Sequence, residues 1–170
     1  MNLFLLRHGM AVEQTIPEFK LDSDRPLTPE GRKKTGRIAA ILSGLQISFD
    51  LILTSPYVRA RQTAEIVVEV LGAQKALEIG KNLAPGNTLK QLIAELNHRS
   101  TPLNEVLLVG HEPELSCLIS ILVTGKTGLA LELKKSGLCK LEIGTLRYGR
   151  CATLQWLLAP KLCAQHKSNG

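Results

Sequence analysis

Aromatic residues are scarce in this chain, and long apolar runs are absent. Phe, Trp and Tyr make up 4% of its 170 residues. Few side chains could therefore stack on nucleobases, and nucleic-acid binding is not predicted. No apolar stretch approaches the roughly 20 residues that a membrane helix needs. The apolar run at the N-terminus ends at Arg7 and is too short for a signal peptide. We therefore expect a cytoplasmic protein that binds no membrane.

Cysteine and glycine motifs with a chemical function are also missing. None of the four cysteines belongs to a CxxC motif, so we expect free thiols in a reducing compartment. They are Cys117, Cys139, Cys151 and Cys163. His111-Glu112 begins like a zinc-binding HExxH helix, but position 115 is leucine. The glycines form neither a GxGxxG motif nor a P-loop. The sequence therefore predicts no metal and no cofactor.

The residues that are present describe one basic globular domain. Hydrophobic residues make up 44% of the chain, enough for a core, and the net charge is +6. The densest basic patches are 32–34 and Lys134-Lys135, and the surplus charge favours anionic substrates. We expect a single domain over residues 1–160, followed by a polar tail over 161–170.

Short apolar runs alternate with amphipathic segments along the chain. The expected strands cover residues 3–6, 51–54, 77–79, 106–109, 137–143 and 151–158. Helices are expected to open at Thr28-Pro29, Ser55-Pro56, Thr88 and Pro113. The segment 11–26 has no clear period and is expected to be a loop. This alternation indicates an α/β fold with a mainly parallel sheet, which the last two strands make mixed.

Polar residues follow three of the expected strands. Arg7-His8-Gly9 comes after the first, 55–59 after the second and His111 after the third. Ligands of such folds bind beyond the carboxyl ends of the strands, so these segments predict a site. His8 suits nucleophilic attack near neutral pH, since the ordinary pKa of histidine is about 6.5. Gly9 is expected to turn the backbone away and leave the space before the imidazole open.

Four segments occur in an order that is typical of one family. They are Arg7-His8-Gly9, 25–31 (RPLTPEG), 55–64 (SPYVRARQTA) and 109–111 (VGH). Together they resemble the motifs of the histidine phosphatase superfamily, also called the phosphoglycerate mutase-like family. The short chain and its RPLT segment look most like the SixA-type phosphohistidine phosphatases. The resemblance implies a three-layer α/β/α sandwich with a mainly parallel, mixed central sheet.

The resemblance also implies roles for individual residues. His8 would attack phosphorus and form a phosphohistidine intermediate, which water then hydrolyses. Arg7 and Arg59 offer planar forks of N–H donors for the phosphoryl oxygens. His111, if protonated, supplies another cationic donor, and Arg25 is expected to bind phosphate at the rim. Two other histidines, His98 and His166, match no motif, and no metal is implied.

A general acid is hard to find in the sequence. The segment 83–87 has no acidic residue where mutase-like relatives place a glutamate. Glu112 follows the second histidine, as an aspartate does in acid phosphatases, but Pro113 comes next and the direction of its carboxyl is open. A P–N bond is labile and its imidazole leaves without much help, so a missing acid favours an N-phosphate substrate.

We therefore expect a phosphatase that acts on phosphohistidine proteins, in particular on histidine phosphotransfer domains of two-component relays. Two alternatives stay open: a small-molecule phosphatase or mutase of the same superfamily, and an inactive module that binds phosphorylated proteins. The short segment between Leu71 and Thr88 is not expected to fold into a lid. The sequence thus predicts an open, basic depression that a protein surface can approach.

Overall fold

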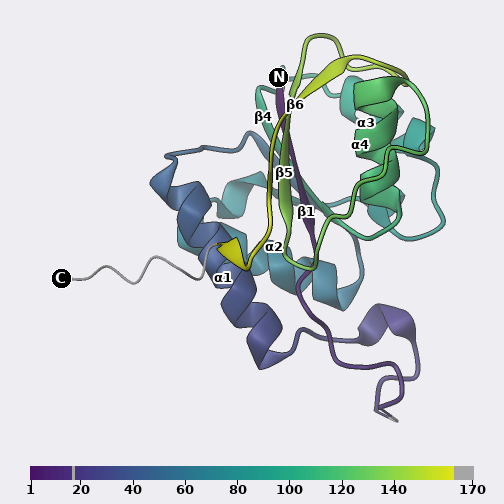
Figure 1. The fold of residues 1–170 in the computed structure, drawn as a ribbon. Coiled ribbons are helices and arrows are strands. Elements are labelled where there is room, and N and C mark those ends of the chain that lie inside the picture. Colours follow the sequence, from purple (N-terminus) through teal and green to yellow (C-terminus); the bar gives the residue numbers. More distant parts are fainter. Residues whose placement is uncertain (17, 163–170) are drawn as a thin grey trace.

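The computed structural model describes residues 1–16 and 18–162, and a six-stranded mixed sheet forms its centre (Figure 1). The strand order is β3-β2-β4-β1-β5-β6. The strands are β1 (Asn2–Arg7), β2 (Leu51–Thr54), β3 (Leu77–Ile79), β4 (Glu105–Gly110), β5 (Leu138–Ile143) and β6 (Ala152–Leu158). The first four pair in parallel, whereas β5 is antiparallel to both β1 and β6. The mainly parallel, mixed sheet is confirmed.

Helices cover both faces of this sheet (Figure 1). They are α1 (Pro29–Gly44), α2 (Val58–Leu71), α3 (Leu89–Asn97) and α4 (Glu114–Thr124). Successive side chains of a strand point to opposite faces. Leu3 and Leu5 of β1 accordingly share a core with α3 and α4, while Phe4 and Leu6 share one with α1 and α2. The expected three-layer α/β/α sandwich is therefore confirmed.

Two of the predicted helix starts are confirmed by their capping contacts. The Thr28 side chain accepts a hydrogen bond from the Gly31 N–H at 3.0 Å, ahead of α1. Thr88 forms a capping box with Gln91 ahead of α3. The prediction that Ser55 caps α2 is wrong, because that helix begins at Val58 without any side-chain cap. Ser55 is fully buried, and its hydroxyl lies 2.7 Å from His111 Nε2 instead.

The irregular segments contain more structure than the sequence predicts. The expected loop over 11–26 includes a short 3₁₀ helix, η1 (Asp22–Asp24), and an antiparallel bridge joins Ala11 to Leu27. The segment between α2 and α3 holds two further 3₁₀ helices and β3, and no helical lid. The bridge places Ala11, at the beginning of this segment, beside Leu27, which lies just before the N-cap of α1.

The described cysteines are free, and they are Cys117, Cys139 and Cys151. Burial raises the pKa of the Cys139 thiol to about 12, so this thiol stays protonated and inert. Cys163, His166 and most of the predicted polar tail lie outside the described residues. Within the described part of the chain, no helix has the length and apolar character required to cross a bilayer.

Candidate active site

The sheet order brings the predicted site residues together. Because β4 lies between β1 and β2, the segments that follow these three strands meet at one sheet edge. The imidazole rings of His8 and His111 lie 5.0 Å apart, measured between centroids. Arg59, in the first turn of α2, reaches the same place. His8, Arg59 and His111 are 8%, 5% and 3% exposed, so these three side chains are buried. The open, basic depression stays a prediction.

The hydrogen bonds of His8 define its tautomer. Its Nδ1 lies 2.7 Å from the Gly9 carbonyl oxygen, and because a carbonyl only accepts, Nδ1 carries the proton. The Nε2 lone pair then accepts a hydrogen bond from Arg59 Nε at 3.2 Å. Burial, helped by the charges of Arg59 and Arg7, lowers the pKa of His8 to about 3 against the raising effect of the Gly9 bond. The imidazole is therefore neutral near pH 7.

His111 is also a neutral imidazole, so it does not supply the cationic donor that a protonated form would provide. Burial is the largest cause, and together with the charge of Arg59 it lowers the pKa of His111 to about 4. Its Nε2 lies 2.7 Å from the Ser55 hydroxyl. Its Nδ1 is buried and has no hydrogen-bond partner among the described residues. If Ser55 donates to Nε2, Nδ1 bears the proton and is the donor available to a ligand.

Asp22 joins Arg59 to Arg25, and this contact was missed by the sequence reasoning. The Arg59 guanidinium donates from Nη2 to Asp22 Oδ2 at 2.8 Å and from Nη1 to the Asp22 carbonyl at 2.6 Å. Arg25 donates from Nε to Asp22 Oδ1 at 2.8 Å and from Nη1 to the Val12 carbonyl at 2.9 Å. Arg25 thus reaches the cluster only through Asp22, at its rim.

The same contacts fix the charge state of Asp22. Partial burial tends to raise the pKa of this carboxyl, but hydrogen bonds from Arg59 and Arg25 outweigh burial and lower the pKa below its usual value. Asp22 is therefore ionised at neutral pH and partly neutralises two guanidinium groups. Its only sequence signal is an acidic residue three positions before Arg25, which is common in loops.

Arg7 ends β1 directly before His8. Its Nη1 donates to the Leu133 carbonyl at 2.9 Å, which ties the guanidinium to the segment before β5. Its Nε is buried and has no hydrogen-bond partner within residues 1–16 and 18–162. Arg7 therefore brings one cationic group to the site with a donor still available.

Gly9 has a different role from the one that the sequence predicted. Its φ is not in the left-handed region, so no special turn requires a glycine here. A Cβ at this position would lie 2.8 Å from Thr35 Oγ1 and 3.1 Å from the Gly31 carbonyl oxygen. The Gly9 N–H also donates to Thr63 Oγ1 at 3.0 Å. The glycine thus allows the chain after His8 to pack tightly between α1 and α2.

The carboxylate of Glu112 is engaged at the start of α4. Its Oε1 accepts a hydrogen bond from the Ser116 N–H at 3.2 Å. This contact satisfies one of the free backbone donors in the first turn of the helix. Of the two acids discussed for this site, Asp22 is paired with arginines and Glu112 with a helix start.

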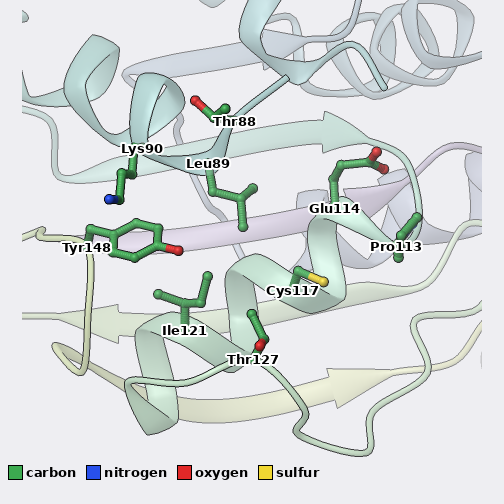
Figure 2. Close-up of a pocket in the computed structure, with 9 residues that line it drawn as sticks. All are labelled: Thr88, Leu89, Lys90, Pro113, Glu114, Cys117, Ile121, Thr127 and Tyr148. Carbon is green, nitrogen blue, oxygen red and sulfur yellow. The ribbon is translucent and has the colours of Figure 1, made fainter. Parts of the chain in front are cut away.

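A separate hollow of about 500 Å³ lies beyond Pro113. Figure 2 shows its lining, in which Lys90 and Tyr148 face Glu114 and Cys117 across the space. The Lys90 Nζ lies 5.1 Å from the centroid of the Tyr148 ring. None of the four predicted catalytic residues lines this hollow, so it is distinct from the histidine cluster.

The other described histidine, His98, lies outside the cluster. The exposed His98 ends α3, where its Nδ1 lies 2.6 Å from the Ala94 carbonyl. Over the described ranges, no group of three or more His, Cys, Asp or Glu residues is placed to hold a metal ion. The site is thus built from imidazole and guanidinium groups together with Asp22.

Comparison with known proteins agrees with this arrangement. The model of the histidine phosphatase superfamily (branch 1) matches residues 3–84. An uncharacterized protein of Picosynechococcus is 38% identical over 149 residues, which cover 86% of this chain and 88% of that protein. The phosphohistidine phosphatase SixA of Escherichia coli is 30% identical over 128 residues, which cover 75% of this chain and 77% of that protein.

Solved structures give the same result. A structure of the protein histidine phosphatase SixA in complex with tungstate matches with a TM-score of 0.82 and 27% identity, over 95% of this chain and 99% of that one. The α-ribazole phosphatase from Shigella flexneri shares the fold, with a TM-score of 0.66 and 20% identity, over 94% of this chain and 97% of that one. The chain therefore belongs to the histidine phosphatase superfamily, within which it is SixA-like.

Proposed function

We propose that this protein is a phosphohistidine phosphatase, with residues 1–160 acting as one catalytic domain. The observation that carries the proposal is the state of His8. Its Nδ1 proton is held by the Gly9 carbonyl, its imidazole is neutral, and its Nε2 lone pair faces Arg59. A neutral imidazole with a fixed tautomer, beside a guanidinium group, is prepared to attack an anionic phosphorus centre.

In the first step, His8 Nε2 attacks the phosphorus atom of the substrate. The new P–Nε2 bond forms as the bond from phosphorus to the leaving imidazole nitrogen breaks, and the bonding electrons go to that nitrogen. In the second step, water attacks phosphorus and both of its protons leave with the inorganic phosphate, while the P–Nε2 bond breaks and its electrons return to Nε2. His8 regains its lone pair, so the cycle balances without a metal or cofactor.

The transferring group spreads negative charge over its equatorial oxygens, and cationic donors stabilise that charge. We assign this role to Arg7 and Arg59, with His111 donating from Nδ1. Arg25 would act at the rim through Asp22. The SixA structure in complex with tungstate supports the binding of an oxyanion by a protein of this fold, because tungstate is a tetrahedral oxyanion like phosphate.

The state of the two acids supports an N-phosphate substrate. An alcohol leaving group needs a proton donor, but Asp22 is held ionised by two arginines and Glu112 binds a backbone N–H. The imidazole of a phosphohistidine leaves without such a donor. We therefore propose phosphorylated histidine phosphotransfer domains as substrates, in the cytoplasm, where the free thiols of the chain are stable.

The test is a turnover assay on a phosphohistidine protein beside a panel of phosphate esters, with and without a chelator. We expect phosphate release from the phosphoprotein at the higher kcat/KM, and no loss of activity on chelation. A better ester substrate would establish the small-molecule phosphatase instead. The absence of any turnover by a folded protein that still binds phosphoprotein would establish the inactive binding module.

A trapping experiment tests the proposed intermediate. Rapid acid-free quenching with labelled substrate should leave a base-stable, acid-labile phosphoryl adduct on the wild type. His8→Ala should carry none, whereas His98→Ala, which removes a histidine outside the cluster, should be labelled like the wild type. Equal labelling of His8→Ala would remove His8 from its assigned role.

A further inference from the structure

A second cavity, of about 510 Å³, lies beside Arg7. Its walls come from the end of β1, from α1, from the segment before β5 and from residues 159–161 after β6. The end of β6 lies next to α1 (Figure 1). The fold thus unites Lys34 with Lys134 and Lys135, which belong to the two densest basic patches of the sequence. We call this space the basic cavity, and its charged residues are Arg7, Lys34, Glu132, Lys134, Lys135 and Lys161.

The basic cavity carries more positive charge than its own acids neutralise. Lys134 forms an ion pair with Glu132, the one carboxylate in the lining, and Lys34 pairs with Glu30 at 2.7 Å. Lys135 and Lys161 form no ion pair among the described residues, and both are exposed. Their charges, with that of Arg7, face a space wide enough for several side chains.

We propose that the basic cavity receives carboxylate side chains from the surface of the phosphohistidine protein while its phosphoryl group occupies the site at His8. The proposal rests on the proposed function and names the feature of the substrate that is recognised. Arg7 belongs to both places, since it lines the cavity and directly precedes His8. An acidic patch next to the phosphohistidine would therefore lie on the side of the site where these lysines are found.

The exposure of these lysines favours a protein over a small anion. The Lys134 side chain is 59% exposed, and a single ion pair at such a position contributes little binding energy. Several carboxylates on one rigid surface add their contributions and also steer the encounter of the two proteins. A small phosphorylated metabolite cannot collect these contributions, because it presents too few charges.

The experiment compares two double variants with equal changes in net charge. Lys135→Glu/Lys161→Glu reverses the two unpaired lysines of the basic cavity. Lys75→Glu/Lys126→Glu is the matched control, because both of its lysines are exposed and neither lines the cavity. Each variant is assayed on a phosphorylated histidine phosphotransfer protein and on phosphoramidate, a small N-phosphate, over a range of salt concentrations.

We expect the cavity variant to have a kcat/KM for the phosphoprotein about tenfold below that of the wild type, because its KM is raised. The dependence of this kcat/KM on salt concentration should also be weaker than in the wild type. Turnover of phosphoramidate should match the wild type, and the control variant should retain the phosphoprotein kinetics. Equal phosphoprotein kinetics in the two variants would overturn the proposal. A parallel loss on phosphoramidate would also overturn it, because the lysines would then serve the phosphate site. Failure of the proposed function is distinguishable, since the wild type itself would then not turn over the phosphoprotein.

Discussion

Two buried neutral histidines should make this protein sensitive to acid well above the pH at which carboxylates titrate. We consider His8→Asn, which keeps a side-chain donor near the Gly9 carbonyl but removes the titrating imidazole. Burial lowers the pKa of His8 to about 3 and that of His111 to about 4, from an ordinary value of 6.5. Each histidine therefore resists protonation in the folded state, whereas the unfolded chain takes up a proton below pH 6.5.

The sign and size of the effect follow from proton linkage. Between pH 6.5 and the folded pKa values the unfolded state binds more protons, so stability is full above pH 6.5 and falls as the pH drops. Within this window, each histidine lowers the free energy of unfolding by up to about 1.4 kcal/mol for every unit by which the pH falls. From about pH 6.5 to about pH 4.5 the loss is about 2 kcal/mol for each residue, a large share of a typical stability.

Urea unfolding of the wild type and the variant over this pH range measures the difference directly. We expect His8→Asn to lose about 2 kcal/mol less than the wild type on acidification, and His111→Asn to behave in the same way. His98→Asn controls for the removal of an exposed histidine and should follow the wild type. If all four proteins lose stability in parallel, the two imidazoles are not held neutral by the fold, and the argument for His8 as a ready nucleophile fails.

Three further predictions concern the arginines and the packing of α1. Arg59→Ala should lower kcat/KM by about 10²–10³-fold, as expected for the loss of one transition-state donor. Arg25→Ala should lower kcat/KM less, and the reverse order in steady-state kinetics would contradict the geometry. Asp22→Asn should tighten tungstate binding about fivefold in a calorimetric titration, because a competing carboxylate is removed, and weaker binding would contradict this. Gly31→Ala should lower the free energy of unfolding by about 3 kcal/mol or more. The new Cβ at position 31 would lie 2.2 Å from the backbone carbonyl oxygen of Met10. A Cβ at Gly36, in the same helix, meets nothing within 4 Å, so Gly36→Ala should slightly stabilise the folded protein. Equal unfolding midpoints for the two variants would refute this contrast.

The parts of the site that follow regular strands were predictable from the sequence. A buried strand fixes where its last residue lies, and neighbouring parallel strands end at one edge, so Arg7-His8 and His111 had to converge once the strand order was known. Arg59 was predictable because it opens a helix that leaves the same edge. These predictions needed only periodicity, helix-start signals and the family order of the motifs.

Ser55 and Asp22 were not predictable in the same way. Ser55-Pro56 carries the same local signal as Thr28-Pro29, yet only the threonine caps its helix. The difference is tertiary, because the Ser55 hydroxyl is buried against His111. Asp22 meets Arg59 across 37 residues of sequence from an irregular segment, where no periodicity reports which way a side chain points.

If His8 is the nucleophile that we propose, its hydrogen bond with Arg59 couples phosphate binding to the availability of that nucleophile. In the mechanism proposed above, Nε2 is the attacking atom, but in this structure its lone pair accepts the Arg59 Nε proton. Attack therefore requires that bond to break. Arg59 is held from its other side by Asp22, and an anionic phosphoryl group offers the guanidinium a stronger acceptor than a neutral imidazole does. A ligand that draws the guanidinium towards itself frees Nε2 in the same movement, whereas a neutral ligand leaves the nucleophile occupied.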